Sequence, residues 1–78
     1  MKNAIINTIL PDEVRMLKKR IDKVTLLNLN ESSMELDGEL TDEIKESIVG
    51  ERNKMMGHCL SSIIRIEKWV KKLGENND

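Results

Sequence analysis

The chain has 78 residues, of which 38% are hydrophobic and 35% charged, and its formal net charge at pH 7 is −1. Trp69 is its only aromatic residue and Cys59 its only cysteine, which excludes an intramolecular disulfide. One small domain with an aliphatic core is expected, stabilised by close helix packing or by self-association. The chain contains neither a signal-peptide pattern nor a run of about twenty apolar residues, so we expect a soluble cytoplasmic protein without membrane contact.

A first helix is predicted over about residues 11–29. Pro11 suits a first helical turn, and Asp12 and Glu13 complement the positive end of the helix dipole. The residues before Pro11 are expected to form a short helix or arm. Asn28 follows the apolar stripe; it either is buried and fixes the helix register, or belongs to the fraying helix end. The stripe has helical spacing and consists of Val14, Leu17, Ile21, Val24 and Leu27.

Residues 30–40 are predicted to form an acidic connector. Ser32 and Glu35 have the spacing of a capping box for one short turn, and Asp37 followed by Gly38 is a common turn pair. The connector is long enough to return the chain antiparallel to the first helix. The expected fold is therefore an all-α antiparallel helical hairpin.

A second, longer helix is predicted over about residues 41–73, with a disordered tail at 74–78. Thr41 is the expected N-cap, and Gly74 is expected to end the helix. Its apolar residues repeat every seven positions in adjacent columns, and together these columns are broader than one neighbouring helix can cover. Assembly into a homo-oligomeric bundle is expected. The predicted oligomer or partner interface comprises Ile48, Val49, Met55, Met56, Cys59, Ile63, Ile66, Trp69 and Val70.

Charge is distributed in blocks along the chain. Residues 11–29 carry a net charge of +2, residues 30–51 carry −7 and residues 52–73 carry +5. In an antiparallel hairpin the two basic blocks meet at one end, where they would attract a phosphate, a nucleotide or an acidic protein surface; alternatively, the oppositely charged ends pair between subunits. The candidate anion ligands are Lys18, Lys19, Arg20, Arg52, Arg65 and Lys68.

Arg52 occupies a position of the repeat that is otherwise apolar. Its guanidinium is expected to pair with Glu31 or another connector carboxylate, the alternative being a bound phosphate. His58 is expected on the polar face and Cys59 as a buried hydrophobic residue. No metal-ligand, nucleophile or phosphate-loop motif occurs, so we expect no cofactor, no metal and no catalysis.

The segment 10–17 and a second helix carrying Arg52, Gly57 and Arg65 resemble small phage-encoded helical-hairpin proteins that sequester cyclic nucleotides of bacterial immunity. The resemblance implies an oligomer with nucleotide pockets between subunits, in a bacterial host cell. Lys and Arg side chains would bind the phosphates, but the chain has no Tyr or Phe to stack on a base. The implied phosphate ligands are Lys18, Lys19, Arg20 and Arg65.

Two functions follow from these patterns. The first is a non-catalytic regulatory protein, from a phage or a bacterium, that oligomerises and captures a protein partner through its helical surface. The second is a sponge that sequesters a cyclic nucleotide or another anionic signal at a basic pole between subunits. Duplex DNA is not an expected partner, because the chain is not basic overall and lacks a DNA-binding motif.

Overall fold

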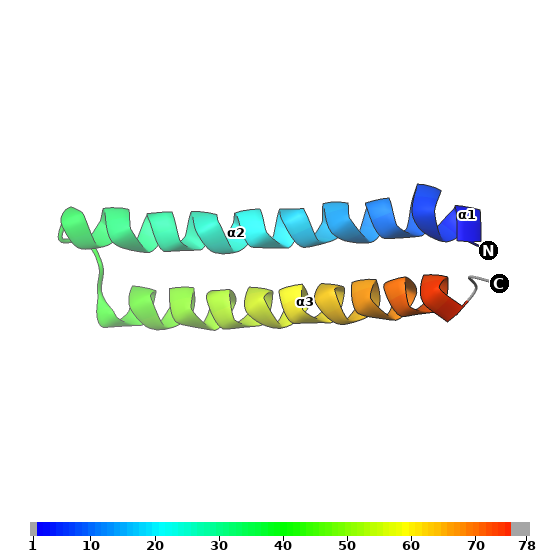
Figure 1. Ribbon diagram of the computed structural model, residues 1–78. Coiled ribbons are helices and arrows are strands. Elements are labelled where there is room, and N and C mark those ends of the chain that lie inside the picture. The colour runs from blue at the N-terminus through cyan, green and yellow to red at the C-terminus, as the bar shows by residue number, and fades with distance from the viewer. Residues whose placement is uncertain (1, 76–78) are drawn as a thin grey trace.

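The computed structural model describes residues 2–75, which form two long antiparallel helices (Figure 1). The first begins with α1 (Lys2–Ala4) and a π-helical turn, η1 (Ile5–Ile9), and continues as α2 (Leu10–Leu36). The second is α3 (Asp42–Glu75). The molecule measures 60 × 16 × 12 Å, and α1 lies beside the end of α3. The all-α antiparallel hairpin is therefore confirmed, while assembly into a larger bundle stays a prediction.

α2 begins at Leu10, so the predicted start near Pro11 is confirmed, but α1 and η1 run directly into α2 as one continuous helix (Figure 1). Proline has no backbone N–H to donate, and its ring crowds the carbonyl group four residues earlier. The preceding turn is widened, and the N–H of Leu10 donates to the carbonyl of Ile5, five residues back. Because this wider turn accommodates the proline, the N-terminal residues extend α2 instead of forming a separate arm.

The C-terminal end of α2 lies beyond its predicted position, at Leu36 instead of near residue 29. Ser32 and Glu35 are both within the helix, so the capping box predicted for a separate turn is wrong. Asn28 is neither buried nor at a fraying end, because it is an exposed residue well inside α2. The polar residues that predict a connector here belong to α2, where Asn30, Ser32, Ser33 and Glu35 are exposed to solvent.

The hairpin turn follows the predicted Asp37-Gly38 pair. Gly38 has a φ of +71°, a left-handed conformation that glycine adopts without steric cost. The N–H of Glu39 donates to the carbonyl of Met34 at 2.9 Å, and that of Gly38 donates to the carbonyl of Glu35 at 3.2 Å. These two bonds form a Schellman motif, which satisfies carbonyl groups at the end of α2.

The start of α3 agrees with the prediction. The Thr41 hydroxyl accepts a hydrogen bond from the backbone N–H of Ile44 at 3.2 Å, which makes Thr41 the N-cap. Asp42 and Glu43 occupy the first turn, where negative charge complements the helix dipole. The helix ends at Glu75 and not at residue 73, since Gly74 is still helical. The remainder of the predicted tail lies outside the described residues.

Each helix turns one row of residues toward the other, and we call these two rows the seam. Spacings of three and four alternate along both rows, and every member is buried or half-buried. On α2 the row is Leu10, Glu13, Leu17, Arg20, Val24, Leu27, Glu31 and Met34. On α3 it is Ile48, Arg52, Met55, Cys59, Ser62, Ile66, Trp69 and Leu73.

The hydrophobic core inside this seam is small. Among the apolar residues that the structure describes, only Ile5 and Ile48 are buried, and the third buried residue is Ser62. Two helices side by side leave much of each helix surface open to water, and five of the sixteen seam positions carry polar side chains. Stabilisation from apolar burial within one chain is consequently limited.

Candidate functional site

A row of apolar residues beside the seam forms the candidate site. The Nη2 atom of Arg65 lies 4.0 Å from the sulfur of Met16, which puts these two residues on the same side of the hairpin. Met16 and Arg65 each lie next to the seam, along one of its two edges. The residues next to the seam along its other edge, on α2 and on α3, therefore lie together on the opposite side of the hairpin. We call this surface the apolar flank; its members are Val14 and Ile21 of α2 and Val49, Met56, Leu60, Ile63 and Val70 of α3.

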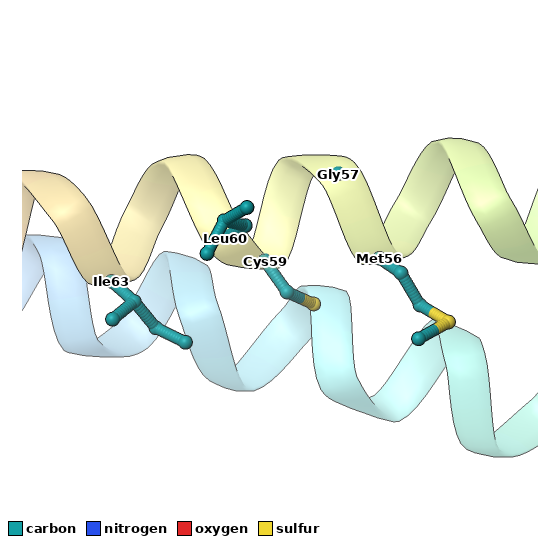
Figure 2. Close-up of a pocket in the computed structure, with 5 residues that line it drawn as sticks. All are labelled: Met56, Gly57, Cys59, Leu60 and Ile63. Atoms are coloured by element: carbon teal, nitrogen blue, oxygen red, sulfur yellow. The ribbon is translucent and has the colours of Figure 1, made fainter.

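The apolar flank is open to solvent along most of its length. Met56 is 55% exposed, Leu60 58% and Val70 53%, although all three are large apolar residues. Near the middle of α3 the surface is hollowed by an open space of about 450 Å³. Figure 2 shows the side chains around this hollow, which is lined by Met56, Gly57, Cys59, Leu60 and Ile63.

The residues predicted to form an interface fall into two groups. One group faces α2 within the same chain and consists of Ile48, Met55, Cys59, Ile66 and Trp69. The other belongs to the apolar flank and consists of Val49, Met56, Ile63 and Val70. Cys59 is half-buried beside the hollow, not buried as the sequence predicted. The expectation that one helix would leave part of the apolar surface uncovered is confirmed.

Two of the predicted anion ligands converge on Ser62, which is completely buried in the seam. An Nη1–H of Arg20 donates to the Ser62 hydroxyl and, at 2.7 Å, to the backbone carbonyl of His58. Arg65 approaches the same hydroxyl at 3.5 Å through Nη2, and its Nε–H donates to Glu13 at 2.8 Å. Both guanidinium groups are thus engaged between the helices. His58 is half-buried, although we expected it on the polar face.

The predicted pairing of Arg52 with Glu31 is confirmed. An Nη1–H of Arg52 donates to the Glu31 carboxylate at 3.1 Å and to the side-chain carbonyl of Asn28 at 3.0 Å. The two charged side chains are only 25% and 22% exposed, so solvent screens their attraction less than at an open surface. Arg52 thereby links α3 to α2 near the turn.

The other three candidate anion ligands, Lys18, Lys19 and Lys68, are exposed, and none of them forms an ion pair within residues 2–75. Lys68 lies 6.0 Å from the centre of the Trp69 ring, a cation–π distance. A shallow hollow of about 360 Å³ is lined by Asp12, Arg15, Met16 and Lys19. The structure thus separates the six candidates into three that join the helices and three that face solvent.

Sequence reasoning missed two residues of the polar seam. Ser62 occupies a seam position between apolar residues, but nothing in its local sequence indicates a buried hydroxyl. Glu13 was interpreted only as a residue of the first helical turn. Glu13 and Arg20 occupy seam positions of the repeat that runs from Leu10 to Met34, but both are charged, so a stripe defined by apolar residues passes over them.

Other kinds of site are not found within residues 2–75. No group of three or more His, Cys, Asp or Glu side chains in this range is arranged to hold a metal ion. None of the helices described is long and apolar enough to cross a membrane. Comparison of the chain with protein-family models, with curated proteins and with solved structures finds no match.

Proposed function

We propose that this protein acts by binding, without catalysis, and that the apolar flank is the surface on which a helical partner docks. The observation that supports the proposal most directly is the exposure of Met56, Leu60 and Val70 along one side of a helix that is already packed against α2. Isolated exposed apolar residues are normal on proteins, whereas a contiguous exposed apolar patch is typical of an interaction site.

The shape of the flank favours a helix as the partner. From Val49 to Val70 the flank runs along α3 for roughly 30 Å at the α-helical rise. Its residues recur every seven positions, the pattern on which another helix packs lengthwise with its own apolar stripe. Met56 beside the hollow adds a flexible side chain that adapts to the surface it contacts.

A photo-crosslinking amino acid tests this proposal in living cells. It is placed at position 60 in one variant and, as the matched control, at position 29 in another, because Leu29 is exposed to a similar extent (62%, against 58% for Leu60) but belongs to the outer side of α2. We expect crosslinks to a helical protein segment from position 60 and few from position 29. Equal crosslinking at both positions, or none at position 60, would refute docking at the apolar flank.

We also propose a second candidate function, the sequestration of an anionic nucleotide at the basic pole. The observation that favours it is the exposure of Lys18, Lys19 and Lys68 without partner carboxylates in the described residues. Three further candidates, Arg20, Arg52 and Arg65, already have partners within the chain, and for that reason this function ranks second.

Titration calorimetry separates the two functions. Cyclic dinucleotides and trinucleotides are titrated into the intact protein and into the Lys19→Glu variant. Lys54→Glu is the control, because Lys54 lies in the acidic half that contains the turn (residues 21–58, net charge −5), whereas Lys19 lies in the basic open half. Sequestration predicts heat of binding that is lost in Lys19→Glu and kept in Lys54→Glu, because only Lys19 lies in the basic half. Absence of heat with every nucleotide would eliminate this second function.

A further inference from the structure

We propose that the apolar flank is occupied by a second copy of this chain, packed antiparallel to the first, so that two hairpins form a four-helix bundle. This inference rests on the proposed function, since it names the partner that docks on the flank. Four features of the described residues support it: the symmetry of the flank, the surface area of the hairpin, the distribution of charge and the position of the hollow.

The flank residues of α3 are arranged symmetrically about one point. Val49 and Val70 lie equally far from the midpoint between Cys59 and Leu60, and so do Met56 and Ile63. When a second copy of the helix is turned end for end about this midpoint and laid on the first, Val49 of one copy lies over Val70 of the other. Met56 lies over Ile63 in the same way. A two-fold interface requires this kind of self-complementarity, because one surface contacts its own copy.

The surface area of the hairpin is larger than that of a compact monomer. A folded monomer of 9.0 kDa exposes about 4,900 Å² by the usual scaling with mass. This chain exposes 5934 Å², which is about 1,000 Å² more. A protein interface of ordinary size buries about 800 Å² on each partner. The excess is thus sufficient for one such interface per chain.

Charge selects the antiparallel orientation. Residues 21–58 form the turn half of the hairpin and carry nine acidic and four basic side chains, a net charge of −5. Residues 2–20 and 59–75 form the open half, with nine basic and four acidic side chains and a net charge of +5. An antiparallel copy lays each acidic half beside a basic half, whereas a parallel copy would bring like charges together.

The hollow lies at the point about which the flank is symmetric. Leu60 adjoins this midpoint and is 58% exposed, so in the antiparallel pair each Leu60 lies opposite the hollow of the other copy. A Cβ atom added at Gly57 would have no neighbour within 4 Å, which leaves room there for an incoming side chain. The hollow of about 450 Å³ is larger than a leucine side chain. Figure 2 shows Leu60 and Gly57 on α3 among the residues that line it.

Sedimentation equilibrium of the full chain tests the dimer. We expect the mass of two chains for the unmodified protein and for Leu29→Glu, and the mass of one chain for Leu60→Glu over the same concentration range. Circular dichroism checks that each variant keeps its helices. If Leu60→Glu loses helicity, the melting temperature of the unmodified chain decides, because it rises with protein concentration only if folding is coupled to association.

Single-cysteine chains test the orientation. Val49→Cys and Val70→Cys are made separately in the Cys59→Ala background, mixed, and treated with a short thiol crosslinker. The antiparallel pair predicts crosslinks between the two different chains. Crosslinks of Val49→Cys with itself and of Val70→Cys with itself would show a parallel pair and overturn the proposal.

The mass of the protein in solution and the crosslinks from position 60 in cells together distinguish a second copy of the chain from a different protein on the apolar flank. A protein that stays a monomer at all concentrations, with crosslinks from position 60 to a different protein in cells, refutes the second copy and leaves docking at the apolar flank in place. A dimer that survives Leu60→Glu and dissociates with Leu29→Glu refutes both, because the interface then lies on the outer side of α2.

Discussion

At the scale of single residues, the seam is unusual for its polar centre. Arg20 and Arg65 approach from different helices and share the buried hydroxyl of Ser62, while Glu13 balances one of the two positive charges. A guanidinium group removed from water is costly unless its N–H groups find acceptors. The Ser62 hydroxyl and the His58 carbonyl supply those acceptors for Arg20.

Ser62→Ala should lower the free energy of unfolding by about 1 kcal/mol, because it removes a buried acceptor shared by the half-buried guanidinium groups of Arg20 and Arg65. Urea denaturation monitored by circular dichroism measures this change. Ser61→Ala is the matched control: Ser61 is exposed, and its hydroxyl bonds only to the Gly57 carbonyl of its own helix. A loss of stability in Ser61→Ala as large as that in Ser62→Ala would contradict the role assigned to the buried hydroxyl.

Glu31→Gln should also destabilise the hairpin, by about 1 kcal/mol, because Arg52 loses the carboxylate that it contacts in a sheltered position. Asp12→Asn provides the comparison, since Asp12 and Arg15 form an ion pair at 2.8 Å in which the side chains are 60% and 66% exposed. Thermal and urea unfolding of both variants should show a clear loss only for Glu31→Gln. Equal effects would mean that burial of the pair contributes nothing.

At the scale of elements, the sequence predicted the fold class and the direction of the helices correctly. The cap at Thr41 and the turn at Gly38 were predicted because both depend on local chemistry: a hydroxyl that reaches a nearby N–H, and a residue that tolerates positive φ. The start of α2 near Pro11 was predicted, but its continuity with the preceding residues was not, because a proline in a first helical turn is also compatible with a π-helical turn before it.

Long-range features of the site were only partly predictable. The excess width of the apolar surface followed from the heptad columns, and so did the contact of Arg52 with Glu31. Sequence alone did not separate the columns that α2 covers from the column left exposed, because that depends on the rotation of each helix about its axis. Met55 and Met56 are neighbours in sequence, yet one faces α2 and the other lies on the apolar flank.

Gly38→Ala should destabilise the hairpin by about 1 kcal/mol, since a Cβ atom disfavours the φ of +71° observed there. Gly50→Ala should have the opposite sign, with a gain of up to about 1 kcal/mol, because Gly50 is helical and an added Cβ would meet no atom within 4 Å. Urea midpoints at equal protein concentration measure both changes. Stabilisation by Gly38→Ala would contradict the left-handed turn.

At the scale of the whole molecule, the hairpin is an electric dipole, because its turn half carries a net charge of −5 and its open half a net charge of +5. Salt screens attraction between such halves, because the Debye length shortens from about 14 Å at 50 mM to about 4 Å at 500 mM monovalent salt. For the proposed antiparallel pair, the dissociation constant should therefore rise several-fold over this range in analytical ultracentrifugation. A parallel pair predicts the reverse, since salt would relieve repulsion between like halves.

The polar residues of the seam also limit how the two helices can slide past each other. A stripe made only of leucine and valine fits its neighbour almost equally well after a displacement of seven residues. Here the same displacement would set Arg52 against Val24 in place of Glu31 and would carry Ser62 away from Arg20. Misaligned pairings would leave half-buried guanidinium groups without their acceptors, so a chain with so few buried apolar residues still specifies a single alignment.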